Sequence, residues 1–521
     1  MTSTMGGITS TGDIQESSAG PKMGSTSRDI GYSVGGAKDI NNFRENIEND
    51  YLPLPTDITY EGLFYDYYFD TGQKESCSQL FCPSYSYATS IDPISNETDN
   101  YLSVGLNSGI KDFERKKLNL VIVLDISGSM GSSFKNYYYD GEKQESSDES
   151  KMTIATGAVA DLLGHLKPDD RFGMVLFENN AHKAKPLRKV DRTDMTAIRN
   201  HILEISSTGG TNFEAGYKKG TELFNEHLTN NPEYENRIIF LTDAMPNRGV
   251  TGEEGLLGLT KSNANDKIHT SFIGMGVDFN TELIEQITKI RGANYYSVHS
   301  AEEFQKRMDD QFEYMVTPLV FNLTLNLDAQ GYDIEKVYGS PEANEATGEI
   351  MKVNTLFPSE KKKGKTKGGI VLLKLDRQSP EASMKLSVDY ETREGEKKHS
   401  EKSVTLEDKE NFYDNSGIRK AILLSRYADL MKNWIIDERN NYENQEPVTP
   451  RVNKNDGIIV PKALGKWERQ SVPLQVSEEY KEIFRGFTKY YKDEMDKLND
   501  TTLSKELDII NTLIKSSKGT S

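Results

Sequence analysis

Between residues 118 and 317, continuous apolar runs alternate with segments that repeat their apolar residues at helical spacing. The run LNLVIVL (118–124) is typical of a strand covered on both faces, whereas MTIATGAVADLLGHL (152–166) has the period of a helix. Strands that alternate with helices predict a doubly wound, mainly parallel α/β sheet with helices on both faces. Strands are expected at 118–124, 171–177, 237–243, 268–277 and 295–300, and helices at 152–166, 195–205, 213–228, 254–263, 281–290 and 301–316.

On both sides of this region the apolar period is two, which is typical of β-strands. Residues 49–117 and 318–410 are therefore predicted to be β-rich segments. Each has few strands with which to cover an apolar face alone. We expect the two segments to pair into one β-sandwich into which the α/β domain (118–317) is inserted.

The two ends of the chain differ from these regions and from each other. Residues 1–48 are rich in Gly, Ser and Thr and poor in aliphatic residues, which predicts a disordered tail. Residues 411–521 predict a helical C-terminal region, with an amphipathic helix at 418–435 and a closing pair of helices. A polar segment that contains proline, 440–472, is expected to be a linker between them.

Charge and the N-terminal sequence limit the kinds of partner and compartment. The 63 Lys and Arg residues against 81 Asp and Glu give a net charge of -18, which opposes general binding to nucleic acid or an anionic membrane. No apolar run is long enough for a transmembrane helix, and the N-terminus has no signal-peptide pattern. The sequence therefore predicts an intracellular, cytoplasmic protein. Cys77 and Cys82 can form one disulfide or remain two thiols.

Oxygen-bearing side chains gather where strands of the predicted sheet end. Asp125, at an expected solvent-facing strand end, is followed by Ser127 and Ser129; STGGTN carries Thr211, and LTDA carries Asp243. Ligands of open parallel sheets bind at the carboxyl ends of the strands, so the three loops are expected to meet there. An all-oxygen set favours Mg²⁺, Mn²⁺ or Ca²⁺ over zinc. Taken one at a time, the serines could instead cap a helix and the aspartates could be turn residues.

The segments DISGS, TGGT and LTD, in this order, resemble the metal-ion-dependent adhesion site of von Willebrand factor type A domains. These domains also occur in integrin inserted domains and inter-alpha-trypsin inhibitor heavy chains. The resemblance covers residues 118–317 and implies a Rossmann-like fold. It implies that the hydroxyls of Ser127, Ser129 and Thr211 bind the metal, that Asp125 and Asp243 hold it directly or through water, and that a partner's Asp or Glu takes the last position.

One segment departs from that pattern. The insertion at 131–151 is longer and more acidic than this turn usually is, and it is expected to overhang the metal. Its residues Tyr137, Tyr138 and Tyr139 either contact a partner or belong to a mobile surface insertion.

Sequence signals of catalysis are weak. KKKGKTKGG around Gly364 contains the end of a P-loop pattern, but Ser359 replaces its first glycine and a strand pattern follows, so a basic hairpin is expected. The seven histidines have no metal-ligand spacing, and no serine lies in a G-x-S-x-G motif.

The sequence therefore predicts a non-enzymatic protein-binding or scaffold module in which a divalent cation bridges to an acidic residue of a partner. A metal-assisted hydrolase is one alternative. A scaffold or ATPase cofactor that docks through its C-terminal helices is another.

Overall fold

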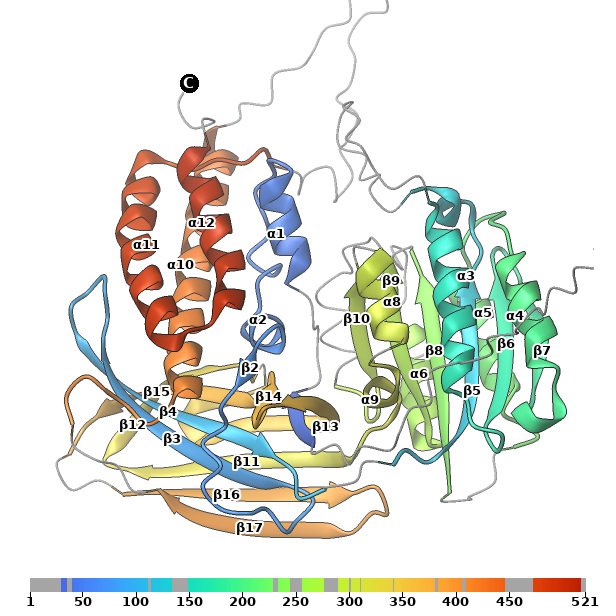
Figure 1. Cartoon of the computed structure of the whole chain (residues 1–521), viewed down its shortest axis with the longest axis horizontal. Coiled ribbons are helices and arrows are strands. Elements are labelled where there is room, and N and C mark those ends of the chain that lie inside the picture. The colour runs from blue at the N-terminus through green and yellow to red at the C-terminus, as the bar shows by residue number, and fades with distance from the viewer. Residues whose placement is uncertain are drawn as a thin grey trace, which may run out of the picture.

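The chain folds into an α/β unit beside a larger β unit that carries a group of helices (Figure 1). The computed structural model describes residues 30–34, 40–110, 114–133, 149–227, 233–243, 255–275, 289–298, 301–309, 311–340, 342–379, 383–404, 409–445 and 472–516.

The α/β unit is built on a six-stranded sheet with the order β10-β9-β8-β5-β6-β7. All neighbouring strands are parallel except β6 and β7, which are antiparallel. This confirms the predicted mainly parallel α/β sheet. The strands are β5 (Lys117–Asp125), β6 (Arg171–Phe177), β7 (Ala181–Lys189), β8 (Tyr234–Thr242), β9 (Ile268–Met275) and β10 (Asn294–Val298).

Helices cover both faces of this sheet because the side chains of its central strand alternate between two cores. Leu120, Ile122 and Leu124 pack on the face of α3, α8 and α9, whereas Val121 and Val123 pack on the face of α5. The helices are α3 (Lys151–Leu162), α4 (Met195–Leu203), α5 (Phe213–Glu222), α6 (Leu256–Asn265), α8 (Ala301–Met308) and α9 (Phe312–Val316). The helix expected at 281–290 falls largely outside the described residues.

The sequence does not predict β7. Its segment AHKAKPLRK has mostly exposed or half-buried residues, since it is the outer strand of the sheet and needs little apolar surface. Pro186 fits this position, because an edge strand tolerates the loss of a backbone donor.

The β unit is a 12-stranded sheet to which both flanks of the α/β unit contribute. Strand β4 pairs antiparallel with β15, and the side chains of both lie in one core with those of β11, β13 and β16. The flanks therefore pair as expected, but they form one hydrogen-bonded sheet instead of two separate sheets of a sandwich. The strands are β1 (Ile30–Val34), β2 (Tyr68–Phe69), β3 (Cys82–Ile91), β4 (Thr98–Asn107), β11 (Val320–Gln330), β12 (Tyr332–Tyr338), β13 (Glu349–Lys362), β14 (Lys365–Lys367), β15 (Ile370–Arg377), β16 (Ser383–Thr392), β17 (Lys397–Val404) and β18 (Phe412–Tyr413).

Strand β1 joins the two halves of this sheet and corrects the expectation of a disordered tail to residue 48. It pairs with β13 over five residues and touches β4 at Gly31. Tyr32 is buried and donates a hydrogen bond to the carbonyl of Leu80 at 2.7 Å. Helix α1 (Asn41–Glu48) follows and buries Phe43. Both elements are short and contain few apolar residues. The average hydrophobicity of the Gly- and Ser-rich segment therefore stays low, which is why its composition predicts disorder.

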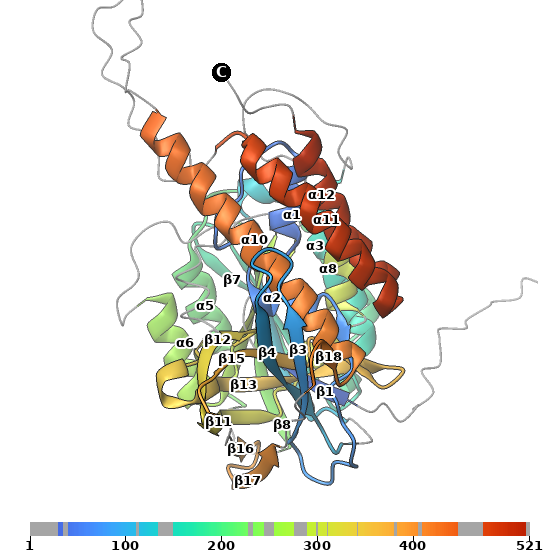
Figure 2. The same ribbon diagram turned by 90° about the vertical axis from the view of Figure 1, so that its left-hand side faces the viewer.

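Five helices form a bundle on the β unit: α1, α2 (Tyr60–Tyr65), α10 (Ser416–Gln445), α11 (Glu478–Leu498) and α12 (Ser504–Lys515). Figure 2 shows α10 and α11 side by side, and their core contains Trp434 and Phe484, whose rings lie 6.0 Å apart. Helix α10 continues to Gln445, so the linker expected from residue 440 begins later. Cys77 and Cys82 form a disulfide, which decides between the two states left open above.

Candidate metal site at the carboxyl edge of the sheet

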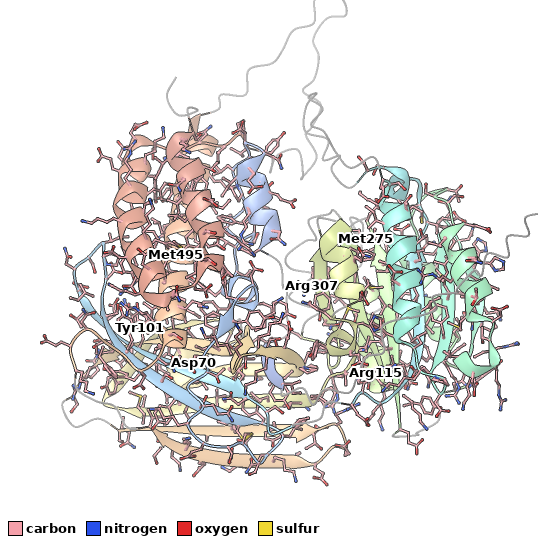
Figure 3. The ribbon with its side chains drawn as sticks, in the orientation of Figure 1. Asp70, Tyr101, Arg115, Met275, Arg307 and Met495 are labelled. Carbon is pink, nitrogen blue, oxygen red and sulfur yellow. A yellow bond between two sulfur atoms is a disulfide. The ribbon has the colours of Figure 1, made fainter. Side chains whose placement is uncertain are left out.

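The candidate site lies where the parallel strands β5 and β8 end side by side. Strand β5 ends at Asp125, and Asp243 directly follows the last residue of β8. Since Leu124 pairs with Leu241, the two carboxylates leave the sheet at the same edge. Figure 3 labels Met275, the last residue of β9, at this edge, and Arg115 toward the opposite edge.

Asp125 is fully buried, which corrects the expected solvent-facing position. One carboxylate oxygen accepts a hydrogen bond from the backbone amide of Ser127 at 2.8 Å, and the other accepts one from the Thr242 hydroxyl at 2.6 Å. Burial raises the pKa of Asp125 to about 6, although both of these hydrogen bonds act to lower it. Asp125 thus fixes the start of the loop that carries the two serines.

Three oxygens beyond Asp125 form a short chain. The hydroxyls of Ser127 and Ser129 lie 3.1 Å apart, and Ser129 donates a hydrogen bond to Asp243 Oδ1 at 2.7 Å. Mg²⁺ binds its octahedral oxygens at about 2.1 Å, which places neighbouring ligand oxygens about 3 Å apart. These separations therefore fit oxygen ligands that coordinate one small, hard cation.

The chemistry of this set differs from that of a histidine or cysteine site. In the part of the chain that the structure describes, no group of three or more His, Cys, Asp or Glu side chains could hold a metal. The candidate set contains only two carboxylates, so hydroxyls would have to supply the remaining protein oxygens.

Thr211 lies in the third loop and is exposed. Within the described ranges, no hydrogen bond joins its side chain to the other four candidate residues. Its loop is nevertheless attached to the serine loop, because Gly128 donates its amide to the carbonyl of Gly209 at 3.0 Å and Thr208 donates to that of Ile126 at 2.6 Å. The structure thus brings the three loops together, with the side chains of Ser127, Ser129 and Asp243 in one hydrogen-bonded chain and Asp125 bonded to the backbone amide of Ser127.

Gly209 shows why this loop needs a glycine. Its φ is +73°, in the left-handed region that side chains disfavour, and a Cβ there would lie 2.7 Å from the Glu178 carboxylate. The amide of Asn212 donates to the carbonyl of Glu178 at 2.6 Å, so the loop after β6 supports the loop that carries Thr211.

Lys151 is part of the site although the sequence analysis does not single it out. Its ammonium donates a hydrogen bond to Asp243 Oδ2 at 3.0 Å, with 10% of the Lys151 side chain and none of the Asp243 side chain exposed. Lys151 is the first residue of α3, where the helix dipole disfavours a cation. A lysine at a helix start is the sequence signal that could have identified it.

The insertion at 131–151 begins and ends beside this site. Ser133 and Ser150 form a β-bridge, and the amide of Lys151 donates to the carbonyl of Ser132 at 2.9 Å. Residues 134–148, with the three tyrosines considered above, lie outside the described residues.

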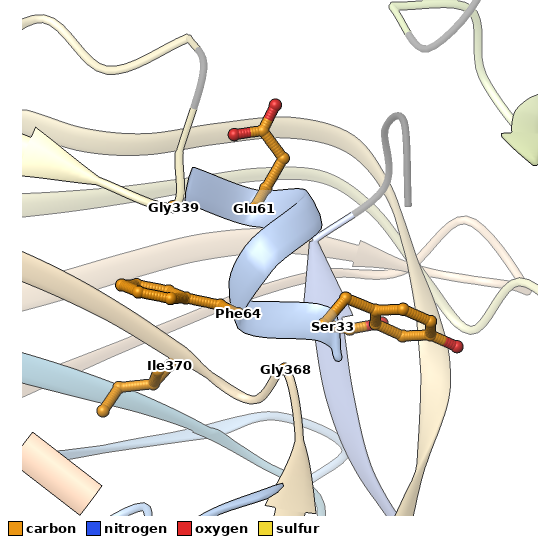
Figure 4. Close-up of a pocket in the computed structure, with 7 residues that line it drawn as sticks. Ser33, Glu61, Phe64, Gly339, Gly368 and Ile370 are labelled. Carbon is orange, nitrogen blue, oxygen red and sulfur yellow. The ribbon is translucent and has the colours of Figure 1, made fainter. Parts of the chain in front are cut away.

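Two other features carry no comparable chemistry. A cavity in the β unit between β1, α2 and β15 (Figure 4) has a volume of about 10 Å³, room for about one water molecule. The lysine-rich segment around Gly364 is a hairpin in which Lys362 of β13 pairs with Lys365 of β14. This confirms the expected basic hairpin.

Comparison with known proteins supports the domain assignment. Residues 120–246 match the family model of the von Willebrand factor type A domain. The human inter-alpha-trypsin inhibitor heavy chain H1 is 27% identical over 214 residues, which cover 40% of this chain and 21% of the relative. The pig heavy chain H1 (Sus scrofa) is 26% identical over 219 residues, or 40% of this chain and 22% of the relative. The alignments thus span about a fifth of the length of these relatives.

Solved structures show lower similarity. A von Willebrand factor type A protein from Catenulispora acidiphila is 14% identical, with a TM-score of 0.41 over 72% of this chain and 84% of its own. The ArnB paralog VWA2 from Sulfolobus acidocaldarius is 13% identical, with a TM-score of 0.37 over 84% of this chain and 97% of its own. Overall similarity at this level adds nothing to the family match.

The match supports a von Willebrand factor type A domain in residues 120–246 of the α/β unit, a kind of module that typically mediates protein interactions without catalysis. The heavy-chain relatives point to an extracellular location, so the expectation of a cytoplasmic protein is wrong. The Cys77–Cys82 disulfide fits an oxidising environment. Across the described ranges, none of the helices has the length and hydropathy to cross a membrane.

Proposed function

We propose that the carboxyl edge of the α/β sheet binds a divalent cation, with Mg²⁺ as the first candidate, and that this cation bridges to an acidic side chain of a partner protein. The chain of oxygens from Ser127 through Ser129 to Asp243 is the observation that carries the proposal. Its separations and its all-oxygen chemistry suit a hard cation.

The residues divide into direct and supporting roles. Ser127, Ser129 and Asp243 would hold the ion, and Thr211 would join them from the third loop. Asp125, whose two oxygens already accept hydrogen bonds, would orient the serine loop and contribute through water. The bound ion would supply an electrophile at the protein surface, to which a partner carboxylate could bind.

The hydrolase alternative has less support. A metal-assisted hydrolysis needs a general base beside the ion. The hydrogen bonds of the site involve carboxylates, hydroxyls and one lysine ammonium. The two carboxylates already accept hydrogen bonds, and Lys151 is itself paired with one of them.

The C-terminal docking alternative also has less support. The apolar faces of α10, α11 and α12 pack together with α1 and α2, so much of their apolar surface is already used in the core. The candidate residues Ser127, Ser129 and Asp243, in contrast, follow strand ends at an edge of the α/β sheet.

The test is calorimetric titration of the full chain with Mg²⁺. We expect binding to the wild-type chain and at least a tenfold loss in the double variant Ser127→Ala/Ser129→Ala, because two neutral ligand oxygens are removed while Asp243 keeps its bond to Lys151. The matched control is Ser400→Ala/Ser403→Ala, which removes two hydroxyls from β17 in the β unit. Equal Mg²⁺ affinity in the wild type and in the Ser127/Ser129 variant would refute the proposal.

A further inference from the structure

Lys151 places a positive charge against the carboxylates of the candidate site. Its ammonium lies 3.0 Å from Asp243 Oδ2, while the other oxygen of the same carboxylate accepts the Ser129 hydroxyl. The Asp243 carboxylate is thus shared between a lysine on one side and the chain of hydroxyls on the other. With both aspartates ionised, the two negative charges and one positive charge sum to -1.

The position of Lys151 is fixed from two directions. Its backbone begins α3, and its amide also donates to Ser132 in the loop that follows Ser129. The side chain is largely buried, which is costly for an ammonium without a paired charge, and Asp243 is the carboxylate that it meets. An exposed lysine could swing away from the site, but this one is held there.

We infer that Lys151 sets the charge of the site, so that it weakens cation binding but strengthens the binding of an acidic ligand to the cation. A divalent ion brings the site from -1 to +1, a charge that one carboxylate neutralises. Without Lys151 the same ion would bring the site from -2 to zero, and an incoming carboxylate would gain less. The inference rests on the proposed function and deepens it, because it explains why the cation-loaded site would attract an anion.

The test changes the charge of Lys151 and measures both steps separately. The full chain is titrated with Mg²⁺ by calorimetry. The chain loaded with Mn²⁺ is then titrated with acetate, a minimal carboxylate, and acetate binding is followed by the water-proton relaxation that Mn²⁺ produces. The variants are Lys151→Met and Lys151→Gln, which remove the charge, and Lys151→Arg, which keeps it.

The two neutral variants should bind Mg²⁺ about tenfold more tightly and acetate about tenfold more weakly, the order expected for one unit charge a few ångström away at a partly exposed site. Lys151→Arg should resemble the wild type in both titrations. The matched control is Lys218→Met on α5, which removes a lysine paired with Glu214 at the surface of the same domain and should change neither affinity. Thermal unfolding in EDTA shows whether each variant is folded. Lys151→Gln keeps a hydrogen-bond donor for Asp243, so it can be used for the test if Lys151→Met does not fold.

Opposite shifts of the two affinities support the inference, because a salt bridge that only stabilises the fold would not move them in opposite directions. If the wild type binds Mg²⁺ and the neutral variants bind it equally well or more weakly, the inference is wrong and the proposed function stands. If the wild type binds no Mg²⁺, the proposed function fails and the inference fails with it.

Discussion

The two edges of the six-stranded sheet use buried carboxylates in different ways. At the amino edge, Asp170 is fully buried and accepts two hydrogen bonds from Arg115 and one each from the amides of Leu118 and Lys167, at 2.6–3.0 Å. At the carboxyl edge, Asp243 accepts one from a hydroxyl and one from Lys151. Burial of a carboxylate is common to both edges, so it does not identify a site. The row of neutral hydroxyl oxygens occurs beside Asp243 and is the feature that suits a cation.

The amino edge also attaches the α/β unit to the β unit. Gly292, just before β10, donates its amide to the Thr355 hydroxyl of β13 at 2.7 Å, and Arg291 pairs with Glu391 of β16 at 2.6 Å. The carboxyl ends of β5 and β8 lie on the side of the α/β sheet that faces away from the β sheet (Figure 1). One edge is therefore committed to holding the molecule together, and the other is the edge that we propose contacts a partner.

The strongest test of this contrast is Asp170→Asn. It removes the buried charged partner of the Arg115 guanidinium and leaves only the partly exposed Glu313 carboxylate, 3.6 Å away, so the α/β unit should lose about 3 kcal/mol of unfolding free energy. Urea unfolding measures the loss, and Mg²⁺ affinity at low urea should not change. The control is the adjacent Asp169→Asn, an exposed carboxylate paired with Lys189, whose loss should have little effect on stability because solvent screens the pair. A similar small loss in both variants would contradict a structural role for the amino edge.

Glu235 gives the amino edge a defined pH dependence. Burial acts to raise the pKa of Glu235, but the charges of His269 and Arg237 outweigh it and lower the pKa to about 2. Because the folded pKa lies below the ordinary value of Glu, the stabilisation is complete above about pH 4.5 and is lost as the pH falls toward 2. We expect Glu235→Gln to cost about 3 kcal/mol at pH 7, with a smaller difference from the wild type at each step below pH 4.5. Thermal unfolding from pH 7 to pH 3 measures this, and a constant difference would exclude the charge as its cause.

A smaller effect is expected at the carboxyl edge from Gly209→Ala. The positive φ and the close Glu178 carboxylate should cost about 1–2 kcal/mol of stability. Because Gly209 accepts a hydrogen bond from Gly128, the variant should also weaken Mg²⁺ binding. Gly164→Ala is the control, since a Cβ there meets nothing within 4 Å. If stability falls as expected but Mg²⁺ affinity does not change, this loop has no part in metal binding.

The smallest expected change is that of Thr211→Ala. Thr211 is exposed, and a water molecule can replace a neutral hydroxyl at a metal, so Mg²⁺ binding should weaken less than tenfold with no change in stability. Calorimetry and thermal unfolding of the same sample measure both. A loss of Mg²⁺ affinity as large as that of the Ser127/Ser129 variant would mean that Thr211 contributes as much to metal binding as the two serines do.

Local patterns were sufficient to predict part of this molecule. The apolar run before Asp125 predicts the central strand, and the rule that parallel strands share a carboxyl edge brings Asp125 and Asp243 together. The position of Lys151 depends on the contact of its backbone amide with Ser132, on the far side of the insertion, which the spacing of residues does not give. The four hydrogen bonds to Asp170 join segments as far as 55 residues apart, and β1 is stabilised by strands more than 300 residues away. Such contacts leave no local signal in the sequence.

The most direct test of the account is to locate the ion. Crystals of the full chain grown with Mn²⁺ should show an anomalous-scattering peak in contact with the hydroxyls of Ser127 and Ser129 at the end of β5, with Lys151 still beside Asp243. Crystals of the Ser127→Ala/Ser129→Ala variant grown in the same way should lack that peak. A bound Mn²⁺ found elsewhere in the wild type, with none at the carboxyl edge, would contradict the central claim.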